Sequence, residues 1–317
     1  MFLYQKVGGN KMEGVLLLNK PVGMTSHDCV AKMRRLAKTK KVGHTGTLDP
    51  DVTGVLPICL GRATKIVEYL TAATKTYEAE ITIGFSTTTE DASGELVERK
   101  NVESPITKGE VEQVLESMIG TIEQIPPMYS AVKVKGKKLY EYARAGIEIE
   151  RPARLITINE LTILGDVKYR DDVVTFRFRV TCSKGTYVRT LAVMIGERLG
   201  YPAHMSHLIR TKSGNFDLNE CYTFEEIEEA VEKNVLQNYL LSIGDALNDL
   251  PKLIIHDNLA EKVKNGAVLE LPTHFQNIEA GSPIAIYNEN QQCLAIYTKH
   301  PTKSHLMKPI KVLYIEA

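Results

Sequence analysis

The sequence has few cysteines and no long apolar run. The five cysteines are odd in number, widely scattered and free of any Cys-x-x-Cys pair: Cys29, Cys59, Cys182, Cys221 and Cys293. This pattern indicates neither a disulfide framework nor a thiolate zinc site, and it fits a reducing cytoplasm. No segment approaches the apolar length that spans a membrane, and residues 1–11 lack the apolar core of a signal peptide. We therefore expect a soluble cytoplasmic protein with no membrane partner.

Several motifs of nucleotide-binding and hydrolytic enzymes are also missing. The sequence contains no Gly-x-Gly-x-x-Gly, no Gly-x-x-x-x-Gly-Lys-Ser/Thr and no Gly-x-Ser-x-Gly element, so nucleotide cofactors and a serine hydrolase lose support. His204 and His207 are three residues apart and could share a metal ion on a helix, but no acidic or cysteine partner accompanies them. The sequence therefore predicts no metal and no cofactor.

Net charge is absent too, since 39 Lys and Arg residues balance 39 Asp and Glu residues. The charges are nevertheless segregated along the chain. Residues 11–75 hold eleven basic against five acidic residues, and residues 129–154 hold seven against three, whereas residues 90–123 hold nine acidic against three basic residues. A neutral protein with this distribution can present a basic surface to RNA. Ordinary solvated faces would give the same counts, so charge alone does not decide.

Apolar periodicity predicts both strands and helices. The segments with strand character are 15–18, 75–85 and 174–182. The pair Thr107 and Glu110 is a capping box for a helix that Gly120 would close. Helices and strands that alternate irregularly, with strands of clean period two, indicate a mixed, mainly antiparallel sheet with packed helices. The predicted fold class is α+β.

The 317 residues are too many for one small core, so we expect two domains. From about residue 253 the sequence changes to a short amphipathic helix and brief strand-like runs, and Pro251 marks the boundary. Residues 8–11 can be encoded by a purine-rich stretch resembling a bacterial ribosome-binding site, so we hypothesise that Met12 is the biological start. The predicted parts are a catalytic domain (12–250), a small β-rich domain (252–317) and an N-terminal extension (1–11).

The segment 43–50 reads Gly-His-Thr-Gly-Thr-Leu-Asp-Pro. Its glycines allow a tight loop that closely approaches a ligand. The proline after Asp49 favours an extended conformation that fixes where the carboxylate points. An isolated Asp-Pro pair would indicate only a turn, so a functional assignment depends on the whole string.

Segment 43–50 resembles the catalytic loop of the TruB family of tRNA pseudouridine synthases, and other segments match the family in the expected order. These are 18–26, 75–77, 126–133, 136–146, 182–190 and 208–214. The resemblance covers about residues 12–218, and the tail is more weakly similar to a PUA RNA-binding domain. It implies the pseudouridine synthase fold followed by a small β-rich PUA-like domain.

The resemblance also implies a reaction: isomerisation of uridine to pseudouridine at position 55 in the T loop of tRNA, without cofactor. The N-glycosidic bond breaks, the base rotates and its C5 rejoins the ribose. Asp49 would be the nucleophile, and Arg189 would keep it ionised through paired hydrogen bonds. Tyr77 would place its ring against the uracil and its hydroxyl as a base. Attack of Asp49 on C1′, glycal formation and attack on uracil C6 all stay open.

Further residues are expected to bind the RNA. Lys20, Tyr187 and Leu208 would contact the substrate, with Leu208 packed beneath the base. The enzyme must extrude its target base, and His44 is the candidate wedge that stacks where the base left. A basic segment interleaved with tyrosines is suited to phosphates and bases. Its predicted RNA-binding residues are Lys133, Lys135, Lys137, Lys138 and Arg144.

The predicted partner is tRNA, bound through its T arm and, by the C-terminal domain, its acceptor stem; we expect a monomer. Three alternatives stay in view. The first is a guide-RNA-dependent relative that acts on ribosomal RNA. The second is a tRNA-binding chaperone without catalysis, which would be indifferent to Asp49→Asn. The third is a hydrolase that uses Asp49, which would need a second carboxylate such as that of Asp51.

Overall fold

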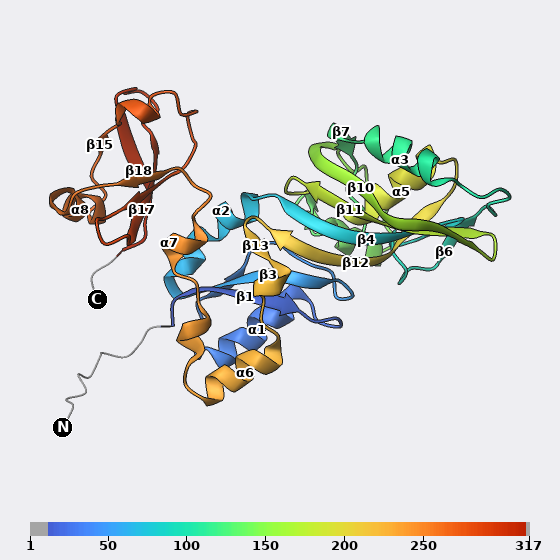
Figure 1. Ribbon diagram of the computed structural model, residues 1–317, viewed down its shortest axis with the longest axis horizontal. Helices are drawn as coiled ribbons and strands as arrows, with labels where there is room; N and C mark the ends of the chain where they lie inside the picture. The colour runs from blue at the N-terminus through green and yellow to red at the C-terminus, as the bar shows by residue number, and fades with distance from the viewer. Residues whose placement is uncertain (1–11, 315–317) are drawn as a thin grey trace.

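Two β-sheets organise the protein in the computed structural model, which describes residues 12–314 (Figure 1). Helices and strands alternate irregularly, and most strand pairs are antiparallel. This confirms the predicted α+β class. The predicted N-terminal extension, residues 1–11, lies outside the described residues, so the hypothesis about Met12 stays a prediction.

The larger sheet has the strand order β1-β3-β12-β4-β11-β10-β7, with β2 beside β3 and β13 beside β12. Only β3 and β12 pair in parallel; the other pairs of this sheet within the described chain are antiparallel. Its strands are β1 (Gly14–Lys20), β2 (Val42–His44), β3 (Thr53–Leu60), β4 (Lys75–Ile83), β7 (Gly120–Gln124), β10 (Arg154–Arg170), β11 (Val173–Cys182), β12 (Ala203–Ser213) and β13 (Phe216–Asp217).

Strands β4 and β11 confirm the two longest strand predictions. They pair throughout, with Tyr77 opposite Val180 and Ile81 opposite Phe176. Every second residue of β11 is buried, and burial of a side chain such as Phe178 contributes about 1.5–3 kcal/mol. Helices α3 and α5 pack their apolar residues into the same core. The apolar alternation therefore fixes which face of the sheet the helices cover.

The helices begin where the sequence supplies capping residues. Thr107 and Glu110 form the predicted capping box of α3. Each side chain accepts a hydrogen bond from the backbone N–H of the other residue. The prediction that Gly120 closes this helix is wrong, because the C-cap is Ser117 and Gly120 opens β7. The α-helices are α1 (Ser26–Leu36), α2 (Val67–Ala72), α3 (Lys108–Glu116), α4 (Leu139–Arg144), α5 (Val188–Arg198), α6 (Phe224–Glu232), α7 (Ile243–Ala246) and α8 (Asp257–Lys264).

His204 and His207 lie on β12 and not on a helix. His204 is buried, its Nδ1 lies 3.1 Å from the carbonyl oxygen of Phe85, and its ring packs on the Phe85 ring. His207 is exposed and lines a cavity instead. An irregularity in the strand pairing separates the two residues. They therefore do not lie one turn apart on a helix, as metal binding by this pair would have required.

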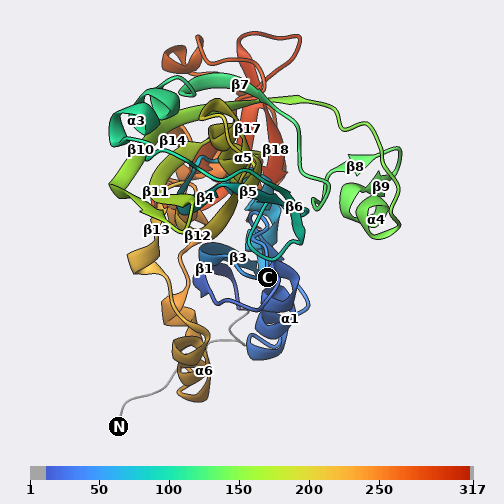
Figure 2. The ribbon, with the colours of Figure 1, turned by 90° about the vertical axis from the view of Figure 1, so that its right-hand side faces the viewer.

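A long insertion connects β7 to β10. It carries the hairpin β8 (Lys133–Val134) and β9 (Lys137–Lys138), followed directly by α4. Figure 2 shows these elements standing apart from the sheet, on the side away from α3. The hairpin turns through Lys135 and Gly136, which both have positive φ angles of 47° and 86°, as a tight two-residue hairpin turn requires. A second hairpin, β5 (Phe85–Thr87) with β6 (Leu96–Arg99), extends beyond β4.

The chain from Lys252 onward forms a second sheet in the order β14-β16-β17-β18-β15. It confirms the predicted β-rich tail, and α8 ends just before Asn265 and Gly266 as expected. Figure 1 shows this module beside α2 and α7. Tyr287 and Ile296 of the module share an apolar cluster with Leu17 and Val55 of the large sheet. Its strands are β14 (Lys252–Ile254), β15 (Leu269–Glu270), β16 (Ile284–Tyr287), β17 (Cys293–Lys299) and β18 (Leu306–Val312).

Gly54 determines how closely the two central strands approach each other. It lies opposite Arg210 in the parallel pair of β3 and β12 and has a φ of 110°. A Cβ atom there would lie 2.1 Å from the backbone oxygen of Arg210. Only glycine therefore fits, for reasons of both backbone conformation and space.

Candidate active site

The loop between β2 and β3 carries Asp49 and is fixed from below by α1 and β1. Ser26, the first residue of α1, accepts a hydrogen bond from the backbone N–H of Leu48 at 2.9 Å. Lys20 donates from Nζ to the carbonyl oxygen of Pro50 at 3.1 Å and to that of Pro21 at 2.8 Å. The loop is therefore held on both sides of Asp49, and the Asp49 side chain keeps 43% of its surface exposed.

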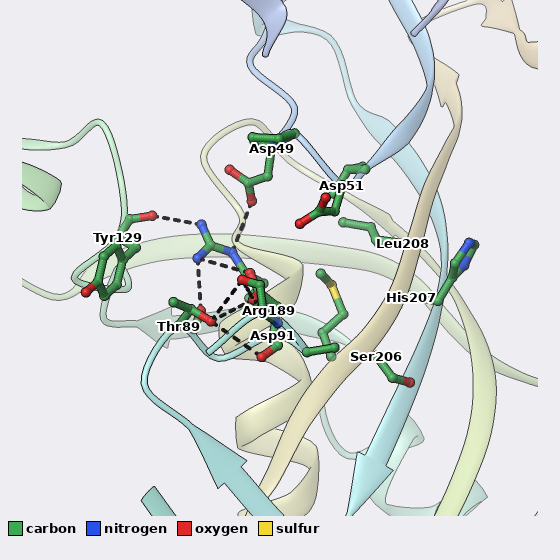
Figure 3. A pocket seen from close by; sticks show the side chains of 14 residues that line it. Asp49, Asp51, Thr89, Asp91, Tyr129, Arg189, Ser206, His207 and Leu208 are labelled. Atoms are coloured by element: carbon green, nitrogen blue, oxygen red, sulfur yellow. Dashed lines mark hydrogen bonds and ion pairs between the residues drawn. The ribbon is translucent and has the colours of Figure 1, made fainter. Parts of the chain in front are cut away.

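Arg189, the second residue of α5, approaches Asp49 from the opposite side of the cleft (Figure 3). Its Nε lies 3.1 Å from Oδ2 of Asp49, and its side chain is 6% exposed. The predicted paired hydrogen bonds are wrong: the other nitrogens donate to the carbonyl oxygens of Thr89 at 2.9 Å and Tyr129 at 2.8 Å. Backbone acceptors thus orient the guanidinium, and one contact is left for Asp49.

Asp91 is a further carboxylate at this arginine, and the sequence analysis did not identify it. Its Oδ2 lies 3.7 Å from Nη1 of Arg189. Its Oδ1 accepts hydrogen bonds from Thr89 and Ser93, at 2.6 Å from each hydroxyl, which fix its side chain. The neighbouring Glu90 has a φ of 64°, unusual for a residue other than glycine. The acidic excess over residues 90–123 was the only available signal.

The electrostatics of Asp49 combine opposing effects. Burial raises the pKa of the Asp49 carboxyl above its ordinary value. The positive charges of Arg189 and Lys20 lower the pKa of Asp49, whereas the negative charge of Asp91 raises it further. A partly buried carboxylate beside a buried arginine has the character of a functional group more often than of a surface ion pair.

Two adjoining cavities meet at Asp49 and Arg189. The larger cavity has a volume of about 650 Å³ and is lined by Tyr77, Tyr187 and the basic residues Lys75, Lys138, Lys184 and Arg210. The smaller cavity has a volume of about 440 Å³, and its lining includes Asp51, Asp91, Ser206 and His207 (Figure 3). Leu208 lines both cavities. The structure therefore brings Asp49, Tyr77, Tyr187, Arg189 and Leu208 together at one cleft.

Tyr77 projects from β4 into the larger cavity. Burial raises the pKa of its hydroxyl, and the nearby Arg210 guanidinium opposes that increase. Tyr187 is the N-cap of α5, and its backbone N–H and carbonyl are both hydrogen-bonded by the side chain of Gln124, at 2.8 Å and 3.0 Å. Both tyrosines are thus held by regular elements or by defined contacts.

Two predicted substrate-binding residues lie elsewhere than expected. Lys20 is completely buried, and its ammonium group donates hydrogen bonds to two backbone carbonyl oxygens. This corrects the expectation of a substrate contact, because Lys20 supports the loop from beneath. His44, at the end of β2, lines neither of the two cavities; its ring packs edge-on against His27 at 5.5 Å, and His27 lines the larger cavity. Burial lowers the pKa of His44.

The predicted RNA-binding residues lie on the insertion. Lys133, Lys135 and Lys137 are exposed on the β8–β9 hairpin. Lys138 and Arg144 both lie over the ring of Tyr140, each 5.3 Å from its centroid. The hairpin and α4 thus carry basic and aromatic side chains, of which Lys138 and Tyr140 line the larger cavity.

Within residues 12–314, no group of three His, Cys, Asp or Glu side chains is placed to hold a metal ion. None of the helices in that range is both long and apolar enough to cross a membrane.

Comparison with known proteins identifies the relatives of the chain. Residues 34–188 match the family described as TruB family pseudouridylate synthase (N terminal domain), and residues 189–248 match the tRNA pseudouridylate synthase B C-terminal domain. The tRNA pseudouridine synthase B of Bacillus subtilis (strain 168) is 65% identical over 95% of this chain and 98% of that protein. That of Bacillus velezensis is 61% identical over 95% and 98%.

Solved structures show the same fold. A Cbf5-Nop10-Gar1 complex contains a chain with 27% identity and a TM-score of 0.71, covering 96% of this chain and 85% of that one. An H/ACA RNP bound to a substrate RNA containing 2'-deoxyuridine contains a chain with 25% identity and a TM-score of 0.71, over 96% and 86%. The protein therefore belongs to the TruB family of pseudouridylate synthases.

Proposed function

We propose that this protein isomerises uridine to pseudouridine at position 55 in the T loop of tRNA, without a cofactor. The observation that supports this most directly is the contact of Asp49 with the buried Arg189 at the junction of two cavities. Membership of the TruB family supplies the reaction class. The high identity to proteins named tRNA pseudouridine synthase B favours tRNA over a guide-dependent ribosomal RNA substrate.

In the proposed mechanism the uracil occupies the cleft between Asp49 and Tyr77, with Leu208 beneath the base. Arg189 favours the ionised form of Asp49, because a nearby cation stabilises a carboxylate that burial would otherwise protonate. The glycosidic bond breaks, the base rotates and C5 bonds to the ribose. Tyr77 acts as the base in the later steps. Attack on C1′, glycal formation and attack on C6 are all compatible with this arrangement.

Extrusion of the target base requires a group that replaces lost stacking. We keep His44 as the candidate. Burial lowers the pKa of His44 and so favours the neutral imidazole, a ring suited to stacking on bases. Its ring lies beside that of His27, which lines the larger cavity, so the proposed wedge lies next to the proposed uracil site.

The RNA-contacting surface is proposed to consist of three parts. Lys133, Lys135, Lys137, Lys138 and Arg144 on the insertion would hold the T arm. Tyr187 would contact the substrate at the cleft. Residues 252–317 would act as a PUA-like domain on the acceptor stem, and residues 12–250 would form the catalytic domain. The protein would act as a monomer in the cytoplasm.

The experiment compares the wild type and Asp49→Asn on an unmodified T-arm transcript without cofactor, followed by nucleoside analysis. We expect pseudouridine at the T-loop position with the wild type only, while both proteins bind the RNA equally. If neither protein forms pseudouridine while both bind, the enzymatic proposal is wrong for this RNA and the chaperone alternative is favoured. Equal turnover by both proteins would remove Asp49 as the nucleophile.

A further inference from the structure

Arg210 is a buried cation beneath the catalytic loop. It lies on β12 between Gly54 of β3 and Tyr77 of β4, and it is 1% exposed. Buried charges in proteins are normally paired with an opposite charge. Within residues 12–314, however, Arg210 forms no ion pair with a carboxylate, and it donates hydrogen bonds to two backbone oxygens instead. Such an arrangement calls for an explanation beyond packing.

The hydrogen bonds of Arg210 connect the two ends of the loop that carries Asp49. Its Nε donates to the carbonyl oxygen of Val55 at 2.7 Å, and its Nη2 donates to that of Gly46 at 3.3 Å. Gly46 precedes Asp49 in the loop, and Val55 follows it at the start of β3. Because a guanidinium is planar and rigid, one side chain fixes the separation of these two ends.

The same guanidinium lies next to Tyr77. The two residues are direct partners on adjacent antiparallel strands, so their side chains lie on the same face of the sheet. Nη1 of Arg210 and Cε of Lys75 both approach Gly46, at 3.5 Å and 4.0 Å from the position that a Cβ would take. Two buried basic side chains therefore lie beside Gly46 of the loop that carries Asp49.

The groups that face the Tyr77 hydroxyl act in opposite directions. Burial raises its pKa most, and Cys182 and Asp49 raise it further, whereas Arg210 lowers it. Arg210 also contributes, after burial, to lowering the pKa of Lys75 to about 8. Among the groups that act on Tyr77, Arg210 is thus the one that favours loss of its proton.

We propose that Arg210 is a positioning residue for the reaction: it holds both ends of the Asp49 loop and keeps its guanidinium beside Tyr77. This inference rests on the proposed function. Arg210 does not need to touch the substrate. It sets the distance between the proposed nucleophile and the proposed base, and it favours the form of Tyr77 that accepts a proton.

The test uses two variants. Arg210→Gln removes both the positive charge and the planar guanidinium, whereas Arg210→Lys keeps the charge but not the guanidinium. Lys212→Gln is the matched control, since Lys212 lies two residues further along β12 and its exposed side chain pairs with Asp217. Single-turnover rates with saturating enzyme separate catalysis from RNA affinity, which is measured by filter binding. Placing 3-fluorotyrosine at position 77 lets ¹⁹F NMR report its titration without turnover.

We expect Arg210→Gln to slow the single-turnover rate by about 100-fold with unchanged RNA affinity, since misplacement of reacting groups by about 1 Å has effects of that size. The fluorotyrosine should titrate at higher pH in this variant. Arg210→Lys should be slow as well but should titrate near the wild-type pH. Lys212→Gln should match the wild type in both measurements.

Unchanged rate and titration in Arg210→Gln would overturn the proposal. A rate loss with unchanged titration in a folded Arg210→Gln protein would show that Arg210 has no effect on Tyr77 and would also contradict it. If Arg210→Gln does not fold, Arg210→Lys decides the loop function through its rate at unchanged affinity. If the wild type forms no pseudouridine, the proposed function fails, while the titration still decides whether Arg210 acts on Tyr77.

Discussion

Asp49 meets two opposing requirements at the scale of one residue. The proposed reaction needs the carboxylate, whereas burial raises its pKa above the ordinary 3.8. A carboxyl whose pKa is higher in the folded state stabilises the fold below its unfolded pKa, where it is protonated in both states. That stabilisation is lost as the pH rises through the folded-state pKa. At neutral pH the charge on Asp49 therefore lowers the free energy of unfolding.

Asp49→Asn removes this charge while keeping the shape of the side chain. We expect its Tm at pH 7 to exceed that of the wild type by roughly 1–2 °C, a small effect because Asp49 is partly exposed. The difference should narrow as the pH is lowered and Asp49 becomes protonated. Calorimetry over a pH series measures both. A lower Tm for the variant at pH 7 would mean that the Arg189 ion pair outweighs the effect of burial.

The sequence was sufficient to predict the contact of Asp49 with Arg189, because both residues stand in distinctive motifs. It could not predict the geometry of the contact. The nitrogens that were expected to bind Asp49 are used by backbone oxygens of Thr89 and Tyr129, and backbone carries no residue-specific signal. Asp91 was missed for a related reason, since an acidic residue in an acidic segment does not stand out.

At the scale of elements, the insertion between β7 and β10 combines a tight hairpin with an attachment that is hydrogen-bonded to the cleft. The tight turn at Lys135 and Gly136 presents three lysines on a short ladder. At the root of the insertion, the carbonyl of Tyr129 binds Arg189 and the side chain of Gln124 binds the backbone of Tyr187. The basic surface is therefore held at a defined position relative to the cleft.

Changing Lys133, Lys135 and Lys137 together to Gln should weaken T-arm binding by about tenfold at moderate salt. The slope of log affinity against log salt should fall by about 0.7–0.9 for each phosphate that the variant no longer neutralises. The rate at saturating enzyme should be unchanged. Filter binding over a salt series measures the effect, with Lys108→Gln on α3 as the control. A wild-type slope in the triple variant would mean that other residues bind the phosphates.

Elements with a clean period were predictable, and strand β12, in the interior of the large sheet, was not. Strands β4 and β11 follow their apolar alternation, and α3 follows its capping box. Strand β12 contains two histidines, two serines, an arginine and a lysine, and irregular pairing interrupts it at two points. Its parallel contact with β3 joins segments about 150 residues apart, and no local pattern specifies such a pairing.

For the whole molecule, the C-terminal module is less independent than a separate domain would be. Tyr287 donates a hydrogen bond to the carbonyl oxygen of Gly244 at 2.8 Å, and Lys65 donates one to that of Val312 at 2.8 Å. Lys311 also pairs with Glu68. Together with the shared apolar cluster, these contacts join the C-terminal module to the rest of the chain through one packed interface.

We therefore expect both sheets to unfold together in urea. Ile296→Ala, a change in a completely buried residue of the module, should cost about 2–5 kcal/mol. It should lower the unfolding midpoint of β1 and β3 as well as that of β16 and β17. Hydrogen exchange with mass spectrometry follows the peptides separately. Loss of protection in β16 and β17 at a urea concentration that leaves β1 and β3 protected would show that the module melts alone.

The close approach of Gly54 to the backbone of Arg210 also limits which substitutions this sequence can accept during evolution. A methyl group at position 54 would require the two central strands to move apart before it could be accommodated. No series of small neutral steps leads through that position, because the first step already disrupts the sheet. Variation around the loop that carries Asp49 can accumulate only at positions that leave this one approach undisturbed.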